Sequence, residues 1–139
     1  MKNRKKGFTI VELVIVIAVI GILSAILIPT FAGLTKNAQE KALQEGLRNS
    51  YVAYSVDYAD QEGYVSEENA YLSASESASA SMKVYKLDAK GVWQEVNVSN
   101  SEGEGYVDPA NLSRAQHEVD GVDTDVEAYN GYYLYVLAV

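Results

Sequence analysis

The stretch KGFTIVELVIVIAVIGILSAILIP, from Lys6 to Pro29, decides the fold of this chain. Its apolar part is about long enough to cross the hydrocarbon core of a bilayer as one helix. Basic residues at positions 2, 4, 5 and 6 come before it, and this bias predicts that the N-terminal end stays in the cytoplasm. One carboxylate, that of Glu12, lies among the apolar residues. The stretch therefore predicts a membrane-inserted helix with a charge that needs a partner.

A secretory signal peptide and a plain membrane anchor are the simplest interpretations of this stretch. A secretory signal has a shorter apolar core that ends in a small-x-small cleavage site, whereas the residues after this core read PTFAGLTKNAQ. A plain anchor fits the length, but it leaves Glu12 unexplained because ionisable residues within a span usually have a partner. Neither interpretation accounts for the whole pattern.

The same residues closely resemble the class III leader and first helix of type IV pilins and the related pseudopilins. The resemblance is strong over residues 4–34 and rests on the basic leader and on Gly7, Phe8, Glu12 and Pro29 at the family's spacing. It implies that a prepilin peptidase cuts between Gly7 and Phe8 and that the new terminus, Phe8, is N-methylated. It also implies a cytoplasmic-membrane protein with its head outside, which an assembly platform then adds to an extracellular filament of pilin subunits.

Glu12 is the candidate assembly residue. A cut after Gly7 would create a positive amine on Phe8, roughly 6 Å along the helix axis from Glu12. Pairing within one chain or between neighbouring subunits would neutralise both groups, and breaking such a pair in a low-dielectric setting costs about 3–5 kcal/mol. We expect Glu12 to set the register of assembly. The alternative is a carboxylate that simply reaches the edge of the membrane.

Gly21 and Pro29 are candidate points of flexibility in the apolar helix. Pro29 lacks an N–H and clashes with the carbonyl of the residue four positions earlier, so a bend or a loosened turn is expected there. Gly21 adds backbone freedom. The family resemblance implies that the stretch between them can lose helicity on assembly.

The apolar helix is expected to continue as an amphipathic one, giving a single helix over residues 8–60. In its second half Leu47, Tyr51, Tyr54 and Tyr58 recur at a spacing that places them on one face. An amphipathic helix buries such a face. We therefore divide the chain into a leader (1–7), a transmembrane and assembly helix (8–34) and an extracytoplasmic head (35–139).

The head is predicted to be a small antiparallel sheet of three or four strands packed on the helix, which makes the fold α+β. Strands are expected over residues 82–87 and 92–98, around the turn DAKG, and over residues 131–139. Trp93 is the only tryptophan and is expected in the core. Residues 64–81, rich in Ser and Ala, are expected to form a mobile connector.

Two further segments of the head are expected to lack strands. Residues 108–119 favour a turn with one short helical turn. Residues 120–127, DGVDTDVE, are expected to form a loop that carries four carboxylates: Asp120, Asp123, Asp125 and Glu127. Calcium prefers six to eight oxygen ligands, so this loop is a possible calcium site, although its spacing is not that of an EF-hand. The alternative is a solvated acidic loop.

Composition excludes several other functions. The chain has 11 basic and 19 acidic residues and a formal net charge of −8, so it offers no basic patch for nucleic acid. It has no cysteine, which excludes the disulfide that closes the C-terminal loop in many relatives of the family. His117 is the only histidine, and no nucleophile–base pair is apparent beside it. We predict that the chain is not an enzyme and, calcium aside, uses no cofactor.

Tyrosine is over-represented, with 11 residues. Tyrosines supply contact area and a polar hydroxyl, so they are expected in the core and in subunit interfaces rather than in an electron conduit along a filament. The sequence thus predicts a structural subunit of a type IV pilus-like filament. The alternatives are a pseudopilin of a type II secretion or DNA-uptake system, and a monomeric membrane-anchored binding protein.

Overall fold

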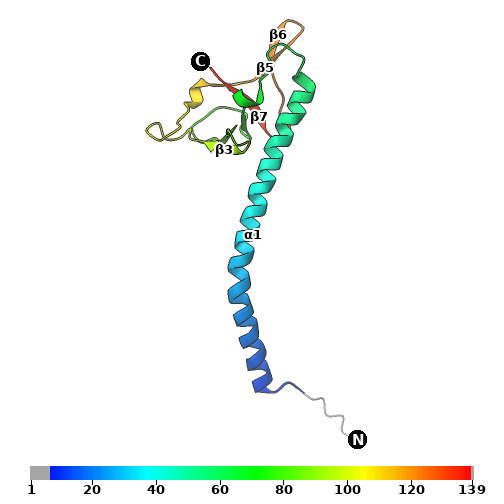
Figure 1. The fold of residues 1–139 in the computed structure, drawn as a ribbon, viewed down its shortest axis with the longest axis vertical. Coiled ribbons are helices and arrows are strands. Elements are labelled where there is room, and N and C mark those ends of the chain that lie inside the picture. The colour runs from blue at the N-terminus through cyan, green and yellow to red at the C-terminus, as the bar shows by residue number, and fades with distance from the viewer. Residues whose placement is uncertain (1–6, 139) are drawn as a thin grey trace. The chain divides into compact units, whose positions relative to one another are not determined.

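A computed structural model describes residues 7–138 of the chain. The predicted leader therefore lies outside the described residues, except for Gly7. The elements follow in chain order (Figure 1): α1 (Ile10–Tyr58), η1 (Glu67–Asn69), β1 (Tyr71–Ser73), β2 (Val84–Leu87), β3 (Trp93–Val96), η2 (Pro109–Asn111), β4 (Leu112–Arg114), β5 (Gln116–Val119), β6 (Val122–Asp125) and β7 (Tyr133–Leu137).

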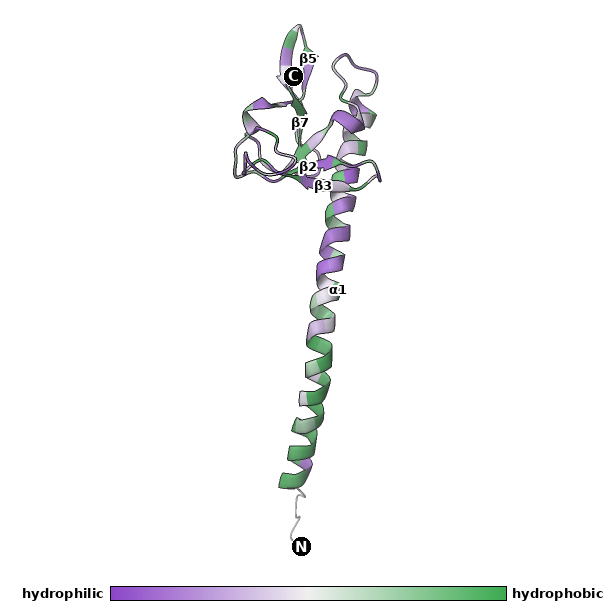
Figure 2. Ribbon diagram, turned by 60° about the vertical axis from the view of Figure 1, so that its left-hand side comes forward, coloured by the Kyte–Doolittle hydropathy of each residue, from purple (hydrophilic) through white to green (hydrophobic). Residues whose placement is uncertain are grey.

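The chain divides into two structural units, residues 1–41 and residues 42–139. The first is the N-terminal part of α1, and Figure 2 shows that its ribbon is predominantly hydrophobic. Its large apolar side chains from Ile10 to Leu34 are 47–81% exposed. By length and composition, this is the one stretch among the described helices that is long and apolar enough to cross a membrane.

The second unit packs the C-terminal part of α1 on a sheet, which confirms the α+β class. Leu47, Tyr51 and Tyr54 are 0–5% exposed and belong to one core cluster with Leu72 and Trp93. The face predicted from the helical spacing is therefore the buried face. The expected core position of Trp93 is confirmed too, because its side chain is 3% exposed.

The main sheet is antiparallel throughout and has five strands in the order β3-β2-β1-β7-β4. The predicted hairpin is confirmed as β2 and β3, joined by a turn in which the Asp88 carboxylate accepts bonds from the N–H groups of Lys90 and Val92. The predicted last strand is confirmed as β7. It lies between β1 and β4, so the C-terminal region is held by strand pairing on both sides without a disulfide.

The prediction of three or four strands missed β1 and β4, which are three residues each. Residues 64–81 were expected to be a connector, yet Tyr71, Leu72 and Ser73 within it are 1–5% exposed and form a central strand. β1 is a strand because β2 and β7 pair with it from both sides. Such pairing between distant segments leaves no periodic signal in three residues.

A separate hairpin of β5 and β6 replaces the loop expected over residues 120–127. Its turn contains Asp120 and Gly121, both at positive φ (51° and 82°). Asp-Gly between two short extended runs is a strong signal for a two-residue hairpin turn, so this hairpin could have been predicted. Of the segment expected to contain a turn and a helical turn, η2 supplies the helical turn and the rest lies mainly in β4 and β5.

The outer edge of β3 is covered by a side chain of α1. The Gln44 amide donates to the carbonyl oxygen of Trp93 at 2.7 Å and accepts from its backbone N–H at 2.8 Å. Gln44 therefore bonds to Trp93 as a neighbouring strand would. Exposed strand edges invite pairing with other chains, and this contact closes part of the edge while fixing α1 against the sheet.

Candidate functional site: helix start and head surface

The N-terminal start of α1 is a capping box. Thr9 precedes the first helical residue, and its Oγ1 accepts from the backbone N–H of Glu12 at 3.2 Å. In return, the Glu12 Oε2 accepts from the backbone N–H of Thr9 at 3.1 Å. These bonds satisfy two donors that a helix start otherwise leaves without partners. Glu12 also favours the helix electrostatically, since the N-terminal end of a helix is positive.

The capping box gives Glu12 a partner within a single chain other than the Phe8 amine expected from the sequence. The signal was present, because Thr9-Ile-Val-Glu12 before an apolar run is the T-x-x-E pattern of such a box. The pairing of Glu12 with an amine on Phe8 stays a prediction. If the capping bond and the pairing with the amine occur together, the two oxygens of the Glu12 carboxylate have to accept from both the Thr9 N–H and the amine.

The bond predicted to be cut lies just outside the helix. Gly7, Phe8 and Thr9 are not helical, and the Phe8 side chain is 82% exposed. Cleavage between Gly7 and Phe8, and methylation of Phe8, stay predictions. Both capping residues lie after this bond, so its loss would remove neither capping bond.

Gly21 and Pro29 lie within a helix that is continuous through both positions. A Cβ added at Gly21 would meet nothing within 4 Å, so in the single chain no close contact requires glycine there. Next to Pro29, the Thr30 hydroxyl donates to the carbonyl of Ile26 at 2.9 Å. This bond engages a carbonyl in the turn that Pro29 weakens by lacking an N–H. A loss of helicity on assembly stays a prediction.

Two tyrosines of α1 hold the segment that follows the helix. The Tyr54 hydroxyl accepts from the backbone N–H of Val65 at 2.9 Å, and the Tyr51 hydroxyl donates to its carbonyl at 2.9 Å. Since the Tyr51 proton goes to this carbonyl, Tyr64, whose hydroxyl lies 2.7 Å away, donates to Tyr51. Burial is the main cause that raises the pKa of Tyr54 above its ordinary value.

The four acidic residues proposed for calcium lie on the β5–β6 hairpin and just after it. Asp123 and Asp125 belong to β6, which is exposed along its length, and the Asp125 carboxylate accepts from the Gln116 side chain at 3.0 Å. Asp120 is in the turn, and Glu127 follows the strand. Within residues 7–138, no three His, Cys, Asp or Glu side chains gather where they could hold a metal ion. The extended strand spreads these carboxylates along the hairpin, so no calcium shell is preformed.

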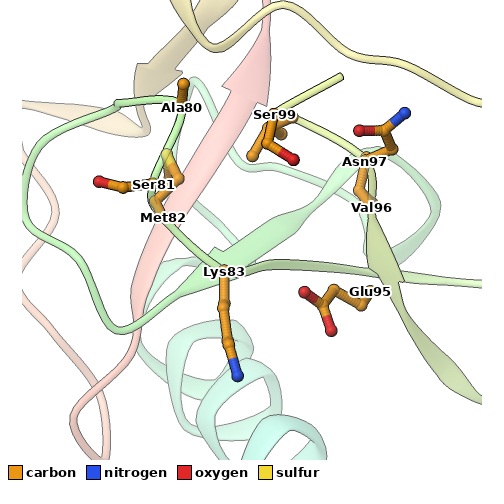
Figure 3. Close-up of a pocket in the computed structure, with 9 residues that line it drawn as sticks. Ala80, Ser81, Met82, Lys83, Glu95, Val96, Asn97 and Ser99 are labelled. Carbon is orange, nitrogen blue, oxygen red and sulfur yellow. The ribbon is translucent and has the colours of Figure 1, made fainter. Parts of the chain in front are cut away.

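A hollow of about 520 Å³ lies on the head between residues 80–83 and 95–99. Figure 3 shows Lys83 and Glu95 on one side of it and Ser99 and Asn97 on the other. His117 is elsewhere, with its ring centroid 5.0 Å from that of Tyr58. The hollow therefore brings together one cation, one carboxylate and neutral polar groups, without a nucleophile beside a histidine base.

Comparisons with known proteins agree with the N-terminal pattern. Residues 2–28 match the family described as the prokaryotic N-terminal methylation motif. A fimbrial protein of Neisseria meningitidis serogroup B is 36% identical over 66 residues, which cover 45% of this chain and 39% of the relative. The type IV major pilin protein PilA of Myxococcus xanthus is 36% identical over 61 residues, covering 44% of this chain and 28% of the relative.

A third relative is the type IV wide pilus major component PilA4 of Thermus thermophilus, 37% identical over 73 residues, which cover 52% of this chain and 55% of that protein. The chain thus spans between about a quarter and about a half of the length of these relatives. No solved structure matches the chain. The methylation motif and these relatives together confirm the resemblance to the type IV pilin family.

Proposed function

We propose that this chain, whose N-terminal region is that of a type IV pilin, is a structural subunit of a type IV pilus-like filament. A prepilin peptidase cuts it between Gly7 and Phe8, and Phe8 is N-methylated. Before assembly, the chain is held in the cytoplasmic membrane with its head outside. An assembly platform then adds it to other pilin subunits in an extracellular filament. It acts as a building block and catalyses no reaction.

The observation that carries this proposal is the exposed apolar surface of α1 with a single carboxylate in its first turn. Among residues 7–138, the large apolar side chains from Ile10 to Leu34 are 47–81% exposed. A contiguous apolar surface of this size requires a cover. A bilayer covers it before assembly, and helices of other subunits cover it in a filament. The named relatives, which are fimbrial proteins and pilins, support the filament as the final cover.

Glu12 has two separable roles in this proposal, as a capping residue and as a charge. Glu12→Gln keeps the cap, because glutamine also serves at the third position of a capping box, but it removes the charge. Glu12→Ala removes both. If the charge pairs with the Phe8 amine between subunits, both variants lose assembly, since breaking a buried pair costs about 3–5 kcal/mol. If Glu12→Gln yields filaments as the parent chain does, the charge has no role in register.

The processing step is tested by mass spectrometry of the N-terminal peptide in the sheared extracellular fraction and in membranes of the native cell. An N-methylated Phe8 terminus abundant in the sheared fraction supports a pilus subunit. The same terminus confined to membranes supports a pseudopilin of a secretion or DNA-uptake system. A peptide that retains residues before Gly7 in both fractions refutes processing and supports a permanent membrane anchor.

A further inference from the structure

Tyr129 makes a short hydrogen bond to a carboxylate from a distant part of the chain. Its Oη donates to the Oδ2 of Asp57, in the last turns of α1, at 2.6 Å. This distance is typical of a charge-assisted bond between a hydroxyl and a carboxylate. Asp57 itself is exposed and Tyr129 is partly buried. The phenol therefore has a proton acceptor in direct contact that is open to water.

The other tyrosine hydroxyls that donate in residues 7–138 have neutral acceptors. Tyr51 donates to the carbonyl of Val65, and Tyr135 donates to the carbonyl of Ser75 at 2.6 Å. Tyr64 donates to another phenol. A neutral carbonyl or hydroxyl holds an extra proton poorly, whereas a carboxylate holds one readily. Tyr129 differs from these phenols in the kind of acceptor it has.

Tyr129 also belongs to a branched group of aromatic rings, which reaches His117 through Tyr58 and Trp93 through Tyr54 and Tyr51. Its ring centroid is 6.4 Å from those of Tyr54 and Tyr58. Tyr54 lies 5.9 Å from Tyr51, and Tyr51 lies 6.4 Å from the buried indole of Trp93. Each step is a direct ring contact of the kind found in packed aromatic pairs. The rings join the sole tryptophan to the phenol that is bonded to Asp57.

An electron leaves a phenol with difficulty unless its proton leaves as well. A neutral tyrosine that loses one electron becomes a strong acid, and a base within hydrogen-bond reach takes the proton in the same step. Burial and the bond to Asp57 raise the pKa of Tyr129, so the phenol is protonated at neutral pH. Removing an electron from Tyr129 therefore requires a place for its proton, and Asp57 is that place.

We propose that Tyr129 and Asp57 form a one-electron redox site in the head. An outer-sphere one-electron oxidant removes an electron from one of these aromatic rings. The electron vacancy that remains then moves to Tyr129. The Tyr129 O–H bond breaks, its proton binds to Oδ2 of Asp57, and a neutral tyrosyl radical remains, while the oxidant is reduced by one electron. A one-electron reductant, with the proton returned from Asp57, restores the phenol. The site draws oxidation away from Trp93, and it does not depend on filament assembly.

The test uses the full chain in detergent, with ruthenium tris(bipyridine), persulfate and light as the one-electron oxidant. An N-methylated luminol in the solution traps tyrosyl radicals covalently, and peptide mass spectrometry then gives the labelled fraction of each tyrosine. Tyr106, whose ring is in none of the aromatic pairs found within residues 7–138, is the internal reference. We expect Tyr129 to carry more label than Tyr106, and to form its radical more slowly in D₂O.

Asp57→Asn is the decisive variant because it keeps the shape of the side chain and removes the base. Removing a positioned base typically slows a proton transfer by about 10² or more, so the ratio of label on Tyr129 to label on Tyr106 should collapse. Asp60→Asn, an exposed aspartate just after the end of α1, is the matched control and should keep the parent ratio. An unchanged ratio in Asp57→Asn overturns the proposal. So does a radical on Tyr129 that forms equally fast in H₂O and D₂O in the parent chain, a measurement that needs no variant.

Discussion

Replacing Gln44 by alanine tests whether one amide holds α1 to the edge of the sheet. The variant loses both bonds between Gln44 and the backbone of Trp93. Each neutral bond contributes about 0.5–1.5 kcal/mol net, so the loss is about 1–3 kcal/mol. The higher helix propensity of alanine returns only a few tenths of a kcal/mol. For a unit of this size, about 4–8 °C of melting temperature is lost per kcal/mol, which predicts a drop of roughly 5–20 °C.

The assay is thermal unfolding of the full chain in detergent micelles, followed by fluorescence. The chain has one tryptophan, Trp93, which is buried at the contact, so its emission reports on this interface directly. Gln39→Ala is the matched control, because Gln39 is exposed on the same helix and should melt as the parent does.

Gln44→Glu separates hydrogen bonding from packing. A carboxylate still accepts from the Trp93 N–H, but at neutral pH it cannot donate to the Trp93 carbonyl. We expect a clear loss of stability relative to the parent that shrinks below about pH 4.3, where a glutamate regains a donor by protonation. If Gln44→Ala melts within about 2 °C of the parent, the two bonds contribute less than about half a kcal/mol to the free energy of unfolding. The amide would then have no part in holding the edge.

Three further outcomes are expected. The melting temperature of the head should be the same in millimolar calcium and in EDTA, because the acidic hairpin has no preformed calcium coordination shell. A higher melting temperature in calcium would show that the carboxylates can gather around the ion. In alkaline titration the phenolate absorbance of Tyr54 and Tyr135 should lag behind that of free tyrosine, because burial raises the pKa of both. The stability that these two buried phenols contribute is fully present below about pH 10 and is lost as the pH rises above it. Circular dichroism should therefore show that the head unfolds as the two tyrosines ionise. Ionisation of both without unfolding would show that their burial does not stabilise the head. Gly131→Ala should destabilise the head by about 1–2 kcal/mol in denaturant unfolding, since Gly131 has φ of 81°, whereas Gly21→Ala should cost no stability there.

The sequence predicted those parts of the fold that repeat a pattern over many residues. The length and apolar character of α1, and the buried face that includes Leu47 and Tyr51, follow from composition and helical spacing. The β2–β3 hairpin follows from two strand-like runs around an Asp-x-x-Gly turn. Each of these signals is local, because the residues that form the element also carry the sequence pattern that predicts it.

The parts that were missed are held by contacts between distant segments. β1 lies in a serine-rich stretch, and its three residues are a strand only because β2 and β7 flank it. The bonds from Gln44 to Trp93 and from Tyr129 to Asp57 join residues 49 and 72 positions apart, and no spacing rule connects them. The capping box and the Asp120-Gly121 turn are different, because both carry short local signatures in the sequence.

The position of β7 determines when the head can become complete. A chain is synthesised from its N-terminal end, so Tyr133–Leu137 emerges after the strands β1 to β6. Until it does, β1 has a partner on one side only and β4 has none in the main sheet. The main sheet is complete only when β7 pairs with both of these strands. A chain that stalls before Tyr133 therefore lacks the strand that joins β1 to β4, and the strand edges that it leaves open can pair with other chains.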